Sequence, residues 1–264
     1  MAKIGFIGMG NMGYAILKGL LKENDPCDLI FTDVNEERMN QVSKETGVPF
    51  AGSNEECAGK AKYVILAVKP QYYDGVLDQI VSVLSKEQII ISIAPGITIA
   101  QLKEKLGMER IVRAMPNTPA LLGEGMTGVA YDAVMFSEEE KETIAGIFES
   151  FGKMELVEER LINAVVCISG SSPAYAYMFI EALADSGVRY GLPRDVAYRM
   201  AAQTLLGSAK MVLETGEHPG KLKDQVCSPG GTTIAAVAAL EEYGFRNAVF
   251  KAGEACYEKC NHMK

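Results

Sequence analysis

Three closely spaced glycines near the start of the chain constrain its fold most. Gly8, Gly10 and Gly13 form a G-x-G-x-x-G pattern within GFIGMGNMG, directly after the apolar run KIGFI. The pattern ends a predicted strand and opens a predicted helix over residues 11–22, so it predicts the first turn of a βαβ unit. Glycines at this spacing permit a tight turn, close approach of a pyrophosphate and close helix packing. We therefore expect a dinucleotide here; a tight turn without a ligand is the alternative.

The rest of the first half alternates apolar runs with helical stretches. DLIFTD, YVILAV, QIIISIA, RIVRAM and GVAYD are predicted strands, rich in Val and Ile. Strands that are apolar on both faces are typical of a sheet covered by helices on both sides. The alternation predicts a mostly parallel, Rossmann-type doubly wound α/β sheet over residues 1–160.

From residue 161 to residue 264 the sequence predicts an all-α C-terminal domain. We expect helices over residues 173–189, 193–214, 233–243 and 248–259. These helices are apolar over most of their surface, and such helices must bury more than one face. We therefore expect self-association through the C-terminal helices, whereas burial only against the same chain is the alternative.

Charge and composition exclude several classes of function. The formal net charge of −8 disfavours binding to a phosphate backbone, so we expect no nucleic acid partner. The uncharged stretch 161–180 is long enough to span a bilayer, but SGSSP interrupts it, so we expect no membrane span. No charged leader with a long apolar block precedes the first strand, which favours a cytoplasmic location.

The six cysteines are expected to be reduced thiols, because no secretory signal accompanies them. Cys256 and Cys260 lie in CYEKCNH, close to His262. A structural zinc site needs four well-spaced ligands, so we expect no metal site and interpret this segment as a helix tail.

Asp33 ends the second predicted strand, twenty residues after Gly13. A carboxylate at this position can accept hydrogen bonds from the adenosine ribose and repels a 2′-phosphate, which favours NADH over NADPH. Arg38 lies close by in sequence and would weaken that preference. The alternative role for Asp33 is to cap the helix that begins near Asn35.

Other strand ends carry candidate cofactor residues. Lys69 and Pro70 end ILAVKP, Pro95 lies in SIAPG, and Asn117 lies between two prolines in RAMPNTP. Ligands of doubly wound sheets bind beyond the carboxyl ends of the strands, so we expect these residues near the cofactor. An ordinary surface position for Lys69 and a simple turn at Asn117 are the alternatives.

A second glycine-rich helix start occurs in DQVCSPGGTTIAA, residues 224–236. Gly230 and Gly231 precede a helix of small residues, and Thr232 or Thr233 could cap it. A helix start with bare glycines presents unpaired backbone N–H groups, which fit a small carboxylate, and a threonine hydroxyl beside them can donate one hydrogen bond. The alternative is a capped helix with small residues for close packing.

The usual groups for alcohol oxidation are absent from promising positions. His218 lies in a predicted turn and His262 is almost terminal. A reaction that needs no strong general base is therefore favoured. Reduction of a protonated C=N bond fits, because an iminium is already electrophilic and needs mainly positioning and a mild donor.

The motifs GFIGMGNMG, AVKP, RAMPNTP, SGSSPAY, DSGVRYGLP and DQVCSPGGTTIAAVAALE resemble those of the pyrroline-5-carboxylate reductase family, from the first strand to the last helix. The resemblance implies an NAD(P)H-dependent oxidoreductase that acts on a CH–NH group. It would reduce 1-pyrroline-5-carboxylate to L-proline in the last step of proline biosynthesis. The family's all-α domain interlocks dimers, which often assemble into decamers. Rival interpretations are another imine or β-hydroxyacid reductase and a regulator that binds a nucleotide without turnover.

The same resemblance implies roles for individual residues. Thr233 would contact the ring nitrogen of the substrate as the catalytic residue, Gly231 and Thr232 would bind its carboxylate next to Gly230, and Glu217 would lie near it. Gln225 stands where the family often has asparagine in contact with the cofactor. The implied cofactor site comprises Ile7, Gly8, Met9, Gly10, Asn11, Met12, Gly13, Asn54, Ala67, Val68, Lys69 and Pro70.

Overall fold

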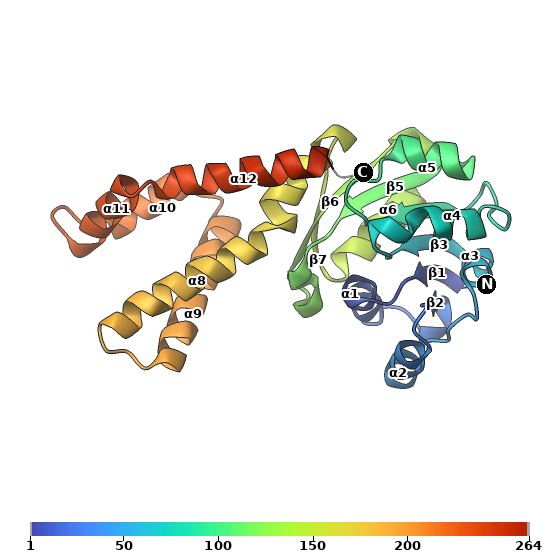
Figure 1. The fold of residues 1–264 in the computed structure, drawn as a ribbon, viewed down its shortest axis with the longest axis horizontal. Helices are drawn as coiled ribbons and strands as arrows, with labels where there is room; N and C mark the ends of the chain where they lie inside the picture. Colours follow the sequence, from blue (N-terminus) through green and yellow to red (C-terminus); the bar gives the residue numbers. More distant parts are fainter. Residues whose placement is uncertain (1, 263–264) are drawn as a thin grey trace. The chain divides into compact units, whose positions relative to one another are not determined.

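The computed structural model describes residues 2–262, with Ala2 described by its backbone alone, and forms two compact units (Figure 1). The first unit runs to Ser171 and takes up the chain again from Cys256, and the second comprises Ser172–Ala255. This division differs from the predicted domains 1–160 and 161–264. The difference arises because residues 162–171 pack on the sheet: a Cβ built at Gly128 would lie 2.7 Å from the Val165 side chain.

The first unit contains a seven-stranded sheet of order β2-β1-β3-β4-β5-β6-β7. Strands β1 to β5 are parallel, β6 runs antiparallel to β5, and β7 is parallel to β6. The mostly parallel sheet is as predicted. The sequence did not predict β7, a strand at the sheet edge with mostly exposed residues. The strands span β1 Ala2–Ile7, β2 Leu29–Thr32, β3 Ala61–Leu66, β4 Ile89–Ser92, β5 Ile111–Met115, β6 Gly125–Tyr131 and β7 Gly152–Leu156.

Helices cover both faces of this sheet (Figure 1). Successive strand residues point to opposite faces, so Phe6 and Ile65 belong to one buried cluster and Ile7 and Leu66 to another. Burial on both faces explains why the strand sequences are continuously apolar. The helices span α1 Asn11–Leu20, α2 Glu36–Thr46, α3 Asn54–Lys60, α4 Tyr73–Ile80, α5 Ile99–Leu106, α6 Glu138–Glu149 and α7 Ile162–Val165.

The second unit is helical. It contains α8 Ser172–Arg189, α9 Arg194–Thr215, α10 Pro219–Val226, α11 Thr232–Glu242 and most of α12 Phe245–Asn261. The predicted helices are present with their ends moved by a few residues, but α10 was not predicted. Pro219 occupies its first turn, where the missing N–H costs nothing, and the His218 ring accepts a hydrogen bond from the Gly220 N–H.

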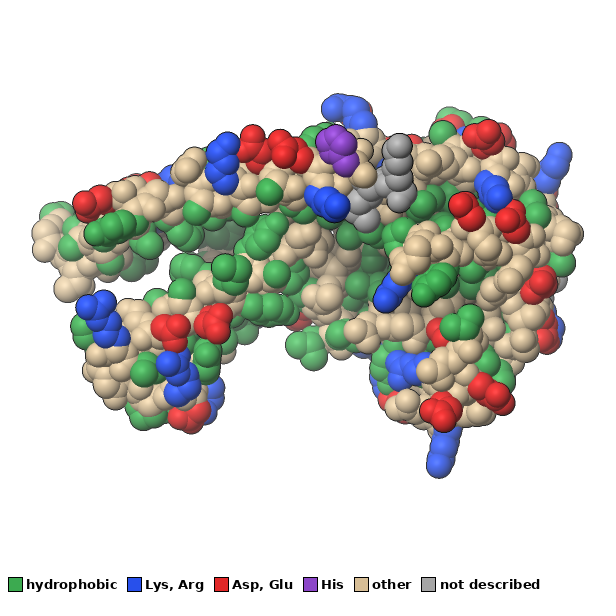
Figure 2. All heavy atoms as spheres, viewed as in Figure 1, with side chains coloured by type: hydrophobic (Ala, Val, Ile, Leu, Met, Phe, Trp, Pro, Cys, Tyr) green, Lys and Arg blue, Asp and Glu red, His purple; other side chains and the backbone are tan. Residues whose placement is uncertain are grey.

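Most apolar side chains of the second unit are exposed. Met178, Leu213, Tyr243 and Phe250 are each at least half exposed, and Figure 2 shows hydrophobic side chains along these helices. None of the helices in residues 2–262 is long and apolar enough to cross a membrane.

Candidate functional site

The glycine turn joins β1 to α1 and lies against the end of β3. Gly8 has a φ of +99°, and a Cβ there would lie 2.7 Å from the Ala67 carbonyl oxygen. A Cβ on Gly13 would collide with the Gly8 carbonyl oxygen, whereas a Cβ on Gly10 would meet nothing within 4 Å. Two of the glycines therefore close the turn, and the third leaves open space in front of the backbone.

Helix α1 begins at this open position. Gly10 is its N-cap and provides no side-chain cap, and Asn11 and Met12 form its first turn. The first N–H groups of an α-helix have no intrahelical acceptor and attract anions. The geometry at Gly10 therefore fits the pyrophosphate of a dinucleotide.

Asp33 and Arg38 both bind the backbone of Met9, one at its N–H and the other at its carbonyl oxygen. The Asp33 carboxylate accepts hydrogen bonds from the Met9 N–H at 2.6 Å and from the Asn35 N–H at 2.9 Å, and the Arg38 Nε donates to the Met9 carbonyl oxygen at 3.1 Å. The Arg38 guanidinium also lies 4.6 Å from the centroid of the Tyr14 ring. The alternative role of Asp33 as the cap of α2 is wrong, because the Asn35 side chain caps that helix.

The remaining candidate cofactor residues of the first unit follow β3 and β4 or precede α3. The Ala67 N–H donates to the Ile7 carbonyl oxygen at 2.8 Å, which brings Ala67 and Val68 to the glycine turn. Asn54 begins α3, and its amide donates to the Gln79 side chain at 2.6 Å. Three residues lie at the strand ends themselves: exposed Lys69 and half-buried Pro70 after β3, and half-buried Pro95 after β4.

The second glycine-rich helix start forms the beginning of α11. Gly230 has a φ of +68°, and Gly231 is the N-cap, with no side-chain cap. The prediction that Thr232 or Thr233 caps this helix is wrong. Gly231 adopts the extended backbone of an N-cap, so both threonines already lie within the first helical turn. The N–H groups of this turn have no cap from the N-cap side chain, and the half-buried Thr233 side chain lies beside them.

Two further candidate residues lie in the second unit near α10. Glu217 is half-buried and precedes the helix, and its carboxylate lies 2.6 Å from the Lys221 Nζ. Gln225 is exposed near the helix end. Gln225 thus belongs to the second unit, whereas the other candidate cofactor residues belong to the first.

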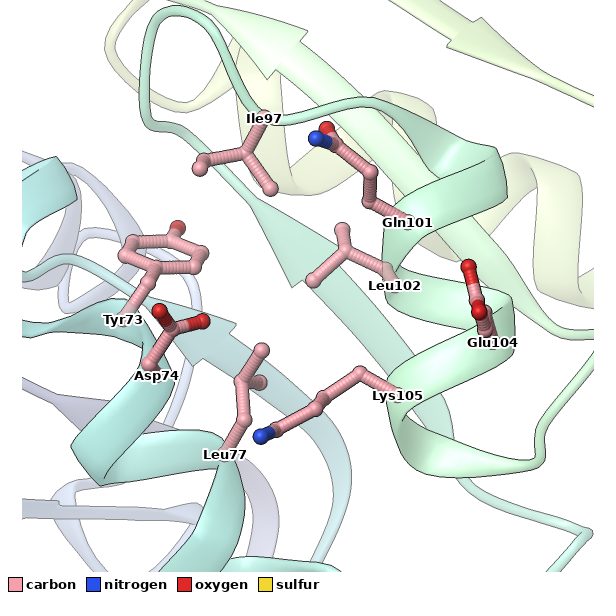
Figure 3. Close-up of a pocket in the computed structure, with 8 residues that line it drawn as sticks. All are labelled: Tyr73, Asp74, Leu77, Ile97, Gln101, Leu102, Glu104 and Lys105. Atoms are coloured by element: carbon pink, nitrogen blue, oxygen red, sulfur yellow. The ribbon is translucent and has the colours of Figure 1, made fainter. Parts of the chain in front are cut away.

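A pocket between α4 and α5 contains none of the predicted site residues (Figure 3). Figure 3 shows Tyr73, Asp74, Gln101 and Lys105 around it. Three of its polar groups have partners within the chain: Tyr73 Oη bonds the Leu66 carbonyl oxygen and Ser92, Gln101 bonds Thr98, and Lys105 pairs with Asp78 of α4. We therefore do not interpret this pocket as the reaction site.

Asn117 neither points freely at a ligand nor only makes a turn. Its side-chain oxygen accepts from the Met126 N–H at 2.9 Å, and its side-chain nitrogen donates to the Ser169 carbonyl oxygen at 3.0 Å. The sequence did not identify this role, because Ser169 lies fifty-two residues further along the chain.

The cysteines of residues 2–262 form no disulfide. Burial, together with the neighbouring Cys256 and Cys260, raises the pKa of Cys167 to about 12. Residues 2–262 contain no group of three or more His, Cys, Asp or Glu side chains that could hold a metal ion.

Comparison with known proteins identifies the family. Residues 159–263 match the model described as pyrroline-5-carboxylate reductase dimerisation, and residues 3–96 match that described as NADP oxidoreductase, coenzyme F420-dependent. The chain is 50% identical to the pyrroline-5-carboxylate reductase of Escherichia coli K12, covering 99% of this chain and 98% of that protein. The chain belongs to the pyrroline-5-carboxylate reductase family.

Other members of the pyrroline-5-carboxylate reductase family agree in sequence and in fold. The Arabidopsis thaliana enzyme is 40% identical over 99% of this chain and 95% of its own length. The solved structure from Coxiella burnetii has a TM-score of 0.92 at 33% identity and covers 98% of this chain and 97% of its own. The NADP-bound structure from Plasmodium falciparum has a TM-score of 0.87 at 35% identity, with the same coverage.

Proposed function

We propose that this chain reduces 1-pyrroline-5-carboxylate to L-proline with a reduced nicotinamide dinucleotide, the last step of proline biosynthesis. The observation that carries the proposal is 50% identity to a pyrroline-5-carboxylate reductase over nearly the whole length of both proteins. The likeness includes both glycine-rich helix starts. The chain is thus an NAD(P)H-dependent oxidoreductase that acts on a CH–NH group.

The first unit binds the cofactor. The space in front of Gly10 and the uncapped first turn of α1 accept the pyrophosphate, and Ala67 and Val68 adjoin that turn. Lys69, Pro70 and Pro95 follow the strand ends where doubly wound sheets bind the rest of a dinucleotide. When bound, the dinucleotide supplies the hydride.

The start of α11 binds the substrate. The backbone N–H groups after Gly230 and Gly231 hold the carboxylate, and Glu217 lies near the bound ring. The Thr233 hydroxyl donates a hydrogen bond to the ring nitrogen of the neutral imine and accepts one from the N–H once that nitrogen is protonated. The ring carbon of the C=N bond gains the hydride and its nitrogen keeps a proton, so the product is a secondary amine. Because a protonated C=N bond is already electrophilic, this chain needs positioning and one mild donor rather than a strong base.

We further propose that NADH is preferred over NADPH. The Asp33 carboxylate is held by the backbone N–H groups of Met9 and Asn35, and a carboxylate beside the ribose repels a 2′-phosphate. The Arg38 guanidinium lies close enough to the Met9 peptide to moderate that repulsion. Gln225, which stands where the family often has asparagine, is proposed as a further cofactor-binding residue.

We also propose that two copies associate through the C-terminal helices and that dimers assemble into decamers. The matched dimerisation model and the exposed apolar side chains of the second unit support the dimer. The decamer and a cytoplasmic location stay predictions.

The decisive experiment measures oxidation of NADH and NADPH by the purified protein with 1-pyrroline-5-carboxylate. We expect turnover with the cyclic imine and none with linear 2-hydroxyacids and NAD⁺. Turnover of the hydroxyacids alone would indicate another reductase of similar layout. Cofactor binding without turnover of any cyclic imine would indicate a nucleotide-binding regulator.

A further inference from the structure

A buried side-chain amide links three separate segments of the first unit. Asn117 is 8% exposed and follows β5 directly after Pro116. Its oxygen accepts from the N–H of Met126, near the start of β6, and its nitrogen donates to the carbonyl oxygen of Ser169. One amide therefore ties the end of β5 to the start of β6 and to the helical segment after α7.

That helical segment contains an irregular turn. Residues Val166–Gly170 form a π-helix, and the Ser171 N–H donates to the Val166 carbonyl oxygen at 2.7 Å. In a regular helix the Ser169 carbonyl would accept from the residue four positions later, but this residue is Pro173, which has no N–H. Ser169 is half-buried, and the Asn117 amide supplies the donor that its carbonyl would otherwise lack within the helix.

The π-turn lies at the carboxyl end of β5. A Cβ built at Gly170 would lie 2.9 Å from the Met115 Cε, and Met115 is the last residue of that strand. Ligands of doubly wound sheets bind beyond the carboxyl ends of the strands. In the strand order of this sheet, the strands from β3 onward, which include β5, face the second half of a dinucleotide. Single π-turns within helices also occur frequently at functional sites.

We propose that Asn117 is a positioning residue for hydride transfer. It fixes the π-turn of residues 166–170 at the end of β5, where that turn forms one wall of the space for the nicotinamide ring. Asn117 acts through Met126 and Ser169 and does not itself contact the substrate. The expected loss of kcat rests on the proposed function, because it requires that reaction. The expected change in bound NADH does not rest on it.

Two substitutions separate the hydrogen bonds of the amide. Asn117→Ala removes both bonds, whereas Asn117→Asp keeps an acceptor for the Met126 N–H and removes the donor to Ser169. Small misplacements of reacting groups cost large factors in rate, so we expect both variants to lower kcat by about 10- to 100-fold. The glycine turn is untouched, so the Kd for NADH should change by less than about threefold, within about 0.7 kcal/mol.

Gln88 offers a matched control at the opposite ends of the strands, where the parallel strands begin. It is also a buried amide, 8% exposed, and precedes β4. Its nitrogen donates at 2.6 Å to the carbonyl oxygens of Ala58 and Ala61, and its oxygen accepts from the Ser85 N–H. Gln88→Ala should lower Tm at least as much as Asn117→Ala, because it leaves three backbone groups without their partner instead of two, but it should leave kcat within about twofold of wild type.

The fluorescence emission of bound NADH gives a readout that does not require turnover. We expect both Asn117 variants to shift that emission toward the value of free NADH, and Gln88→Ala to leave it unchanged. Wild-type turnover of the imine tests the proposed function, while the emission and the kcat ratio test this inference. The inference is overturned if NADH bound to Asn117→Ala emits as it does in wild type. It is also overturned if Gln88→Ala loses as much kcat as Asn117→Ala.

Discussion

The two units of the chain treat their apolar side chains in opposite ways. In the first unit, strands such as β4 are buried along their whole length, and two apolar clusters cover the two faces of the sheet. In the second unit, α11 has no buried residue, and the one buried cluster there consists of three alanines of α8 and α9. The first unit thus forms a complete core from its own chain, whereas the second presents apolar surface that a further partner must cover.

Part of the apolar surface of the second unit forms a groove. An apolar groove runs between α8, α11 and α12, and Met178, Phe179, Leu240 and Val249 are among its lining residues. A surface of this kind on helices is typical of an interface between subunits. The comparison of the two units therefore predicts that substitutions in the first unit act through fold and cofactor, and those in the second through assembly and substrate.

The largest effect is expected from a charge placed in the groove. Met178→Asp would bury a carboxylate in the proposed interface, at a cost of several kcal/mol, so the dimer Kd should rise by more than about 100-fold. Analytical ultracentrifugation would show dissociation, with loss of most activity.

Val134→Asp is the matched control for that substitution. Val134 is 83% exposed on the first unit, compared with 69% for Met178 on the second. We expect Val134→Asp to leave the assembly intact. A dimer of wild-type stability in Met178→Asp would contradict the difference between the two units.

A second pair compares the two glycine-rich helix starts. Gly8 combines a positive φ with close contact to the Ala67 carbonyl, whereas a Cβ at Gly230 would meet nothing within 4 Å. Gly8→Ala should therefore cost about 2–5 kcal/mol from strain and overpacking and weaken NADH binding strongly. Gly230→Ala should cost only about 1–2 kcal/mol of backbone strain. Thermal unfolding and NADH titration would measure both, and equal losses would contradict the difference in packing.

The third prediction concerns acid stability of the first unit. Burial raises the pKa of Glu140, but hydrogen bonds from Arg110 and Lys62 outweigh it and bring the pKa to about 2, below its ordinary 4.5. In the unfolded chain, the Glu140 carboxyl binds a proton at a higher pH than it does in the folded chain. The Glu140 carboxylate therefore stabilises the fold above pH 4.5, and this stabilisation is lost as pH falls toward 2. The loss should reach up to about 3 kcal/mol.

Glu140→Gln isolates that contribution. The variant should be less stable than wild type at neutral pH, and the difference should shrink as pH falls toward 2. Urea unfolding across this range would measure it. A constant difference at every pH would show that Glu140 does not supply the acid dependence.

The smallest effect concerns cofactor choice. Asp33→Ala removes the acceptor for the Met9 N–H and the charge that we propose to lie beside the ribose. We expect the ratio of kcat/KM for NADH to that for NADPH to fall by about tenfold, equivalent to about 1.4 kcal/mol. An unchanged ratio, measured with both cofactors, would remove Asp33 from cofactor selection.

Much of the first unit could be predicted because its signals are local. The central strands are apolar almost throughout since both faces are buried, and Gly8, Gly10 and Gly13 lie within a single turn. The site residues at strand ends follow from the same topology. The helix start itself predicted a threonine hydroxyl as a hydrogen-bond donor, whereas only the family resemblance implied that this threonine is Thr233 and that Glu217 lies near the substrate.

Features that depend on distant contacts could not be predicted. The last turns of α12 pack with the first unit, where Asn261 accepts a hydrogen bond from Asn163, ninety-eight residues earlier. The partner of Asn117 is equally remote. The wrong prediction that a threonine caps α11 has a local cause. Gly231 takes the N-cap position one residue before the threonines.

The central claim is the proposal that the Thr233 hydroxyl, at the second glycine-rich helix start, hydrogen-bonds the ring nitrogen of the substrate during its reduction. The most direct measurement compares kcat/KM for 1-pyrroline-5-carboxylate in Thr233→Ala and Thr233→Ser. We predict a loss of about 10- to 1000-fold in the alanine variant, typical of one positioned donor, and near wild-type turnover in the serine variant. Wild-type turnover in Thr233→Ala would contradict the account.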